Sequence, residues 1–405
     1  MNLAKYKKQL FYTGFFISFI GLFVLTYNIR QQFISNFSNR TFFWGINYLA
    51  YLGFFIMVLL GAVQIGKNIP FLFALIPTLL LALNTTLHTS ASIGFCIMYS
   101  SCCILSICFM FIQLPDGFRT NILYWFMILF NALILILFIW GLIDQIAGKP
   151  IAKWVATFMT YDQRYSYFAY ATDTEGIRFY SFFGHPLVNS TLFNAFFIMN
   201  TLYNKHHKPL MPSYACCIIS FISLTFCGSK TGLFVALAVA LITFYQNMKL
   251  MISLGVIFIG IALSGLMNNL ITRLSHGSLA SGRLTMLASL LKDPNYSFHF
   301  LYGYGNYVAP EYSPAAFEFP FVTFSFQYGI LFALLVLGIP FLYVTIKLLK
   351  KGSVHIWLLW LLLFGQVNTY TCLAQDLDNS LIFYFLTMIL LNIYYDIPFP
   401  KEICK

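Results

Sequence analysis

Residues 121–146 read NILYWFMILFNALILILFIWGLIDQI, and their only charged residue lies in the last turn. A run of about 20 mostly apolar residues is long enough to cross the hydrocarbon core of a bilayer as a helix. The run does not alternate polar and apolar residues, as the strands of a membrane barrel do. This stretch therefore predicts a transmembrane α-helix.

Similar apolar runs recur along the chain. Hydrophobic residues make up 60% of the sequence and charged residues 9%, against about 25% charged residues in soluble domains, which excludes a soluble globule. We expect an all-α, polytopic integral membrane protein of about twelve transmembrane helices, forming one domain over residues 1–405. The expected spans are 9–27, 41–65, 69–87, 91–114, 121–146, 184–204, 213–228, 231–247, 250–267, 319–346, 354–373 and 381–396.

The positive charges predict the orientation. An even number of crossings puts both ends on one side, and that side carries lysines at the start (Lys5, Lys7, Lys8) and at the end (Lys401, Lys405). Nearly all of the formal net charge of +11 falls there. Cytoplasmic loops of membrane proteins are enriched in Lys and Arg, so we expect both termini in the cytoplasm. The charge then requires no nucleic-acid partner.

The nine cysteines and seven histidines predict no metal site. No C-x-x-C motif and no Cys/His pattern with zinc spacing occurs in the sequence. We therefore expect neither a bound metal nor a disulfide framework.

Two predicted extracytoplasmic loops, residues 147–183 and 268–318, are too long to be turns. Loops on a rigid scaffold are where binding and catalytic residues concentrate. The second loop predicts a short amphipathic helix that ends before Pro294. Its expected apolar stripe is Leu284, Leu287, Ala288 and Leu291.

Three cations lie near the predicted outer face. Arg283 falls in the first turn of the short helix, where the helix dipole disfavours a cation. An anion bound there by the free amides and the guanidinium would remove the conflict; alternatively, Arg283 is solvated. Lys230 lies in the turn Gly228–Gly232, just before another helix, and Arg178 precedes the span that begins near His185.

Four sequence elements follow one another in a recognisable order. An Arg precedes FFGHPLVNSTLF (182–193), then come GSKTGLFVALAVAL (228–241), SGRLTMLASLL (281–291) leading to LYGYG (301–305), and FEFPFVTFSFQYGILFALL (317–335). In this order they resemble the O-antigen polymerase and O-antigen ligase superfamily, which includes the Wzy-type polysaccharide polymerases. The resemblance covers about residues 178–335 and extends to the twelve-span layout.

The resemblance implies an inverting glycosyl transfer, without metal or cofactor, at the outer face of the cytoplasmic membrane of a bacterium. The donor would be an oligosaccharide repeat unit linked by pyrophosphate to undecaprenol, and a hydroxyl of another saccharide would be the acceptor. The expected enzyme is an O-antigen or capsule polymerase. A flippase and a chain-length regulator would be its protein partners, and membrane lipid its surroundings.

The resemblance also assigns residues. Glu318 stands where ligases of the superfamily typically carry a His, which favours a polymerase and makes Glu318 the expected catalytic base. Alternatively, Glu318 is a rim carboxylate paired with an arginine. His185 and His276 are competing bases, each with a structural alternative. The cations expected to bind the pyrophosphate are Arg178, Lys230, Arg273 and Arg283.

Other hypotheses stay open. Aromatic residues of the first loop, such as Trp154 and Tyr161, would stack on sugars or form an interfacial belt. Asp376 and Asp378 would line an acceptor groove or be solvated. A ligase that transfers a finished glycan to lipid or protein differs only in its acceptor. A lipid-linked oligosaccharide flippase would be expected to show internal repeats and charges deep in helices, which this sequence lacks.

Overall fold

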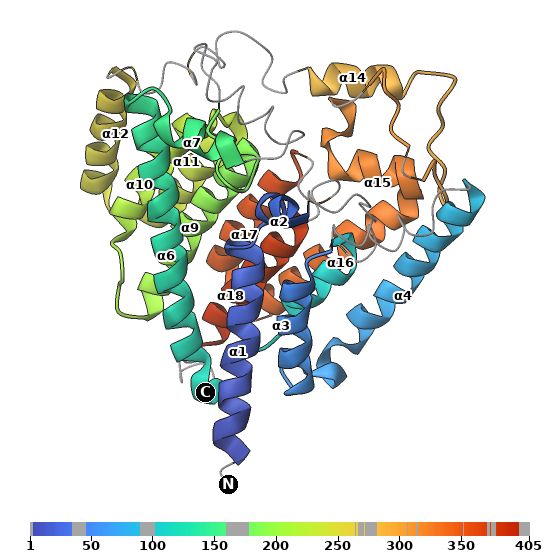
Figure 1. Cartoon of the computed structure of the whole chain (residues 1–405), viewed down its shortest axis with the longest axis horizontal. Helices are drawn as coiled ribbons and strands as arrows, with labels where there is room; N and C mark the ends of the chain where they lie inside the picture. The colour runs from blue at the N-terminus through green and yellow to red at the C-terminus, as the bar shows by residue number, and fades with distance from the viewer. Residues whose placement is uncertain are drawn as a thin grey trace.

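The computed structural model shows an all-α chain (Figure 1), as the sequence predicts. It describes residues 3–34, 46–89, 102–158, 178–263, 265, 271, 282–305, 307–312, 315–350, 352–370, 373 and 378–396.

Three of the described helices are long and apolar enough to cross a membrane: α4 (Ile65–His88), α6 (Asp116–Ile146) and α16 (Ile330–Leu349). Many of their apolar side chains point outward, including Leu80 at 60% exposed and Ile136 at 58%. Hydrocarbon tails are as apolar as these side chains, so a bilayer would accommodate this surface.

The remaining described helices are mostly shorter. They are α1 (Leu3–Phe23), α2 (Tyr27–Ile34), α3 (Tyr48–Leu59), η2 (Leu105–Phe111), α7 (Pro150–Phe158), α9 (Pro186–His206), α10 (Ser213–Cys227), α11 (Lys230–Phe244), α12 (Met248–Leu263), α14 (Arg283–Leu290), η3 (Ala316–Glu318), α15 (Pro320–Tyr328), α17 (Val354–Val367) and α18 (Asn379–Tyr395).

Helices α9 and α18 form the centre of the bundle. Nearly every residue of both is buried, including several polar residues of α9. Helix α9 contacts α6, α10, α11, α17 and α18. Polar side chains within this core have partners: Asn131 of α6 and Asn200 of α9 donate to each other, at 3.1 and 2.8 Å. The centre is therefore a packed scaffold for residues at the helix ends.

The expected single span over 319–346 is wrong. The chain forms α15 and α16 there, separated at Gly329, whose φ of +98° lies in the region that favours glycine. A Cβ at Gly329 would also press against the backbone of Leu301 and Tyr302. Within the expected span 91–114, Leu105–Phe111 form the short 3₁₀ helix η2.

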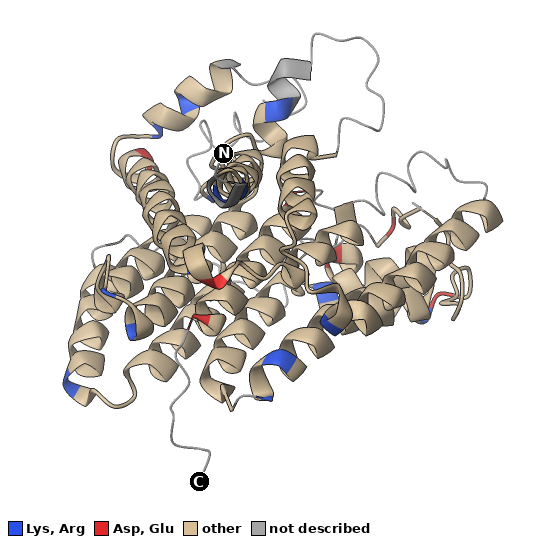
Figure 2. Cartoon of the chain, turned by 90° about the horizontal axis from the view of Figure 1, so that it is seen from below, with Lys and Arg blue, Asp and Glu red and all other residues tan. Residues whose placement is uncertain are grey.

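Different segments of the chain lie at the two ends of the bundle. Helix α1 begins at the lower end of Figure 1, whereas α7 and α14 lie at the upper end. Thr120 donates to Asp396 at 2.9 Å, and His207 lies 3.4 Å from the same carboxylate. These three residues therefore lie at the same end of the bundle. Seen from below, most of the ribbon is uncharged (Figure 2).

Candidate functional site: a cation pocket beside an apolar cavity

Three of the four predicted cations, Arg178, Lys230 and Arg283, line one pocket. They come from three separate segments, which only the fold brings together. We call this site the cation pocket. Its other lining residues are Leu187, Gly228, Ser229, Thr231, Gln366, Thr369 and Tyr370. Arg273 and His276 lie outside the described residues.

The turn between α10 and α11 positions Lys230. Gly228 ends α10 in the left-handed conformation, with φ at +57°. Ser229 then caps α11, because its hydroxyl accepts a hydrogen bond from Gly232 N at 3.0 Å. Lys230 is the first residue of α11, so it lies beside the free amides at the helix N-terminus. The predicted position of Lys230 between two helices, next to a helix start, is confirmed.

The backbone next to Arg178 is held on both sides by hydrogen bonds. Phe179 N donates to Phe226 O at 2.8 Å, next to the turn that carries Lys230. On the other side, Asn189 Nδ2 donates to Phe179 O at 3.0 Å, and Ser181 Oγ donates to Asn189 Oδ1 at 2.5 Å. These bonds set the backbone next to Arg178 relative to α9 and α10.

Arg283 forms an ion pair with Glu318. The two side chains are 15% and 24% exposed, so Arg283 is not simply solvated. The carboxylate relieves the conflict between the cation and the start of α14. The alternative of a rim carboxylate paired with an arginine therefore describes the observed contact. Arg283 Nε is buried and has no hydrogen-bond partner among the described residues.

A small hydrophobic cluster holds Arg283 and Glu318 together. We call it the loop core: Leu290, Ala309, Ala316, Phe317, Val322 and Phe326. Helix α14 contacts η3 through it. The helix is confirmed; Leu290, which lies outside the predicted apolar stripe, is fully buried, whereas Leu284 and Leu291 of the stripe are 60% and 62% exposed. The loop core packs on α14 through Leu290, a position that the helical period did not place on the apolar stripe.

His185 caps the N-terminus of α9. Its Nδ1 accepts a hydrogen bond from Leu187 N at 3.3 Å, and its ring stacks on Tyr370, with centroids 6.1 Å apart. Burial, together with the smaller effect of the charges of Arg178 and Arg283, lowers the pKa of His185 to about 4. The imidazole is therefore neutral near pH 7, with one nitrogen already used in capping.

An apolar cavity of about 510 Å³ adjoins the cation pocket. The two share Lys230, Thr231, Arg283 and Thr369. The cation pocket itself is narrow, with about 20 Å³ for water-sized groups. The other residues of the cavity are Phe234, Val235, Leu284, Phe319 and Leu362. A ligand with an anionic head and an apolar tail would match this combination of surfaces.

Gln366 of α17 is a pocket residue that the sequence analysis missed. It is 2% exposed; its Nε2 donates to Ser190 Oγ at 3.0 Å, and its Oε1 accepts from Asn194 Nδ2 at 2.7 Å. Asn194 also donates to Gly232 O at 3.0 Å. The amides thus connect α17 and α9 to the first turn of α11. A signal existed: polar residues within apolar helices need partners and often mark sites.

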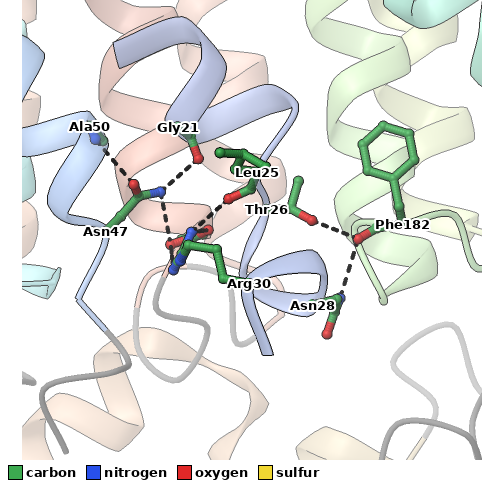
Figure 3. A network of polar contacts seen from close by, with 9 residues as sticks. Gly21, Leu25, Thr26, Asn28, Arg30, Asn47, Ala50 and Phe182 are labelled. Atoms are coloured by element: carbon green, nitrogen blue, oxygen red, sulfur yellow. Dashed lines mark hydrogen bonds and ion pairs between the residues drawn. The ribbon is translucent and has the colours of Figure 1, made fainter. Parts of the chain in front are cut away.

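Asp378 is neither solvated nor part of an open groove. It is 5% exposed and pairs with Arg30 through two hydrogen bonds of 2.7 and 3.0 Å. Asn47 Nδ2 donates to the same carboxylate at 3.4 Å, and Thr26 Oγ1 nearby donates to Phe182 O at 2.8 Å (Figure 3). This network joins the N-terminal helices to α18 and to the segment before α9. Asp376 and Tyr161 lie outside the described residues.

No family model matches this sequence, and neither a curated protein nor a solved structure matches it significantly. Among the described residues, no group of three or more His, Cys, Asp or Glu side chains could hold a metal ion.

Proposed function

We propose that this chain is a polysaccharide polymerase of the cytoplasmic membrane of a bacterium. It joins oligosaccharide repeat units carried on undecaprenyl pyrophosphate, at the outer face, by inverting glycosyl transfer. The proposal includes about twelve spans, cytoplasmic termini and a cation pocket at the outer face. The observation that supports it best is the convergence of Arg178, Lys230 and Arg283 next to an apolar cavity.

The two surfaces suit the two parts of a polyprenyl pyrophosphate. Cations and helix N-termini bind phosphate oxygens, and the apolar cavity would hold the first isoprene units of the carrier. Negative charge builds up on the pyrophosphate as its bond to the sugar breaks. Cations fixed in place before the reaction stabilise that charge. Lys230 would act as a point charge, and the two arginines as bidentate donors.

The ion pair suggests how binding and catalysis are coupled. In the structure the carboxylate of Glu318 is paired with the guanidinium of Arg283. A pyrophosphate would replace the carboxylate at the guanidinium, because it offers more charge and more acceptor oxygens. Glu318 would then be released to accept the proton of the attacking hydroxyl. The hydroxyl oxygen bonds to the anomeric carbon, the bond from that carbon to the pyrophosphate oxygen breaks, and the pyrophosphate leaves with the electron pair.

A ligase is the second candidate, because the cation pocket would serve it equally well. Glu318, at a position where ligases of the similar superfamily carry a His, favours the polymerase. A flippase and a chain-length regulator would then work beside this enzyme.

The test is the length of the surface glycan in a deletion strain and in a strain carrying Glu318→Gln. The matched control is Asp116→Asn, whose carboxylate is 90% exposed at the opposite end of the bundle. Expression and membrane insertion are checked for each variant. We expect single repeat units without a ladder in both the deletion strain and Glu318→Gln, and a normal ladder with the control.

Long polymer left on its lipid carrier in the deletion strain would identify a ligase instead. An unchanged ladder in the deletion strain would reject both transfer reactions.

A further inference from the structure

A cluster of tyrosines in the second loop packs against the loop core. Its members are Tyr296, Tyr304, Tyr307 and Tyr312. The tyrosine rings pack on one another and on Phe326 of the loop core. We call this surface the tyrosine platform. A hydrophobic core below it gives the rings a fixed base.

Tyr307 presents the most open ring of the platform. It is 44% exposed, and its ring stacks on that of Tyr296, with centroids 6.4 Å apart and an angle of 28° between planes. Tyr296 is supported in turn by Phe326, at 5.7 Å between centroids. Tyr307 is therefore packed against Tyr296 and remains partly open to the surroundings.

Carboxylates and hydroxyls form the rim of the platform. Tyr296 Oη lies 3.3 Å from both Tyr307 Oη and Glu311 Oε2, donating to the latter. Tyr312 Oη donates to Asp293 Oδ2 at 2.7 Å. This bond lowers the pKa of Asp293 below its ordinary value, so the carboxylate stays ionised and remains an acceptor.

We propose that the tyrosine platform binds a saccharide, namely the acceptor of the glycosyl transfer; this role rests on the proposed function. One face of a pyranose ring carries C–H groups and its edge carries hydroxyls, which matches an aromatic face with acceptors at its rim. Tyr side chains provide such rigid, amphipathic contact area at low entropic cost. Asp293 and Glu311 argue against a membrane surface as the occupant, because anionic lipids repel carboxylates.

The platform and the proposed base belong to one packed unit. Phe317 lies next to Glu318 in sequence, and its ring contacts Phe326 at 5.0 Å between centroids. Phe326 also supports Tyr304, at 4.5 Å. A saccharide lying on Tyr307 would therefore be held at a fixed distance from Glu318. Its far end would be free to place a hydroxyl at the cation pocket.

The experiment measures binding of one defined oligosaccharide to the full-length protein in nanodiscs of zwitterionic lipid. The probe is the repeat-unit oligosaccharide released by mild acid from the strain's own lipid carrier. We expect Tyr307→Ala to weaken oligosaccharide binding about tenfold, because a few large aromatic side chains usually supply most of the affinity of a contact surface. Tyr307→Phe keeps the ring and should bind normally. Tyr245→Ala, which removes a tyrosine 63% exposed at the end of α11, is the matched control.

Equal affinity in Tyr307→Ala and the unchanged protein would overturn the proposal, as would the absence of any binding. A second set of nanodiscs contains anionic lipid. If Tyr307→Ala alters the stability of the protein only in these nanodiscs and leaves oligosaccharide affinity unchanged, the platform contacts the membrane and the proposal fails. The binding result does not depend on the glycan ladder of the deletion strain, so failure of the proposed function would be recognised separately.

Discussion

Arg283 and Glu318 form an ion pair at the boundary between the cation pocket and the loop core. They stand 35 positions apart in the sequence, and the loop core brings them together. The pair joins the two proposed tasks of the site, binding of an anion and removal of a proton.

The first prediction separates these tasks. Glu318→Gln should lower kcat by about 10²- to 10⁴-fold, the usual contribution of a general base, without raising the KM for the lipid-linked donor. The reason is that the variant no longer competes with the pyrophosphate for Arg283. Arg283→Ala should instead lose donor binding as well as turnover. Steady-state kinetics with purified donor distinguish the two patterns, and an increased donor KM in Glu318→Gln would refute the competition.

The second prediction concerns Gln366. Replacing it by Ala leaves Ser190 and Asn194 without their partner in a buried site, which costs about 1–3 kcal/mol. We expect a lower thermal stability together with weaker donor binding, because the turn at Lys230 loses its support.

The matched control for Gln366 is Asn131→Ala. This variant also removes a buried amide pair, the one between Asn131 of α6 and Asn200 of α9. Neither residue lines the cation pocket. The thermal stability of this variant should fall by a similar amount, with donor affinity unchanged. If both variants weaken donor binding equally, Gln366 has only a general structural role.

The third prediction concerns the buried pair Arg30–Asp378. Removing one partner of such a pair leaves a buried charge and costs about 3–5 kcal/mol. Asp378→Ala should therefore lower the unfolding temperature of the solubilised protein strongly. The double variant Arg30→Met with Asp378→Leu removes both charges and should recover most of the loss. Absence of recovery would mean that the pair does more than stabilise the bundle.

The fourth prediction concerns pH. The folded protein keeps the pKa of His185 near 4, below its ordinary value of 6.5, so the unfolded chain binds a proton between these values and the folded chain does not. Stability from this group is complete above pH 6.5 and is lost as the pH falls towards 4. His185→Asn keeps a capping side chain and should flatten this part of the pH–stability curve. An identical curve would show that His185 does not contribute.

The unbroken apolar runs predict an all-helical chain with membrane-length helices, because a run of this kind is visible in the order of neighbouring residues. The same holds for α14 within residues 283–290 and for the placement of Lys230 after Gly228, where a glycine and a serine define a helix end locally. Periodicity did not predict the break at Gly329. There the chain folds back on residues 299–302, a contact that depends on distant residues.

The tertiary structure decided which of the candidate residues meet. The sequence identifies Arg178, Lys230 and Arg283 as candidate anion-binding residues. Their spacing along the chain does not show that they line one pocket. The tertiary structure also decided that Glu318 pairs with Arg283 and that Asp378 is buried against Arg30. Side-chain pairing across a bundle depends on how helices pack in three dimensions, as does the break at Gly329, whereas local sequence determines most of the helices and many of their ends.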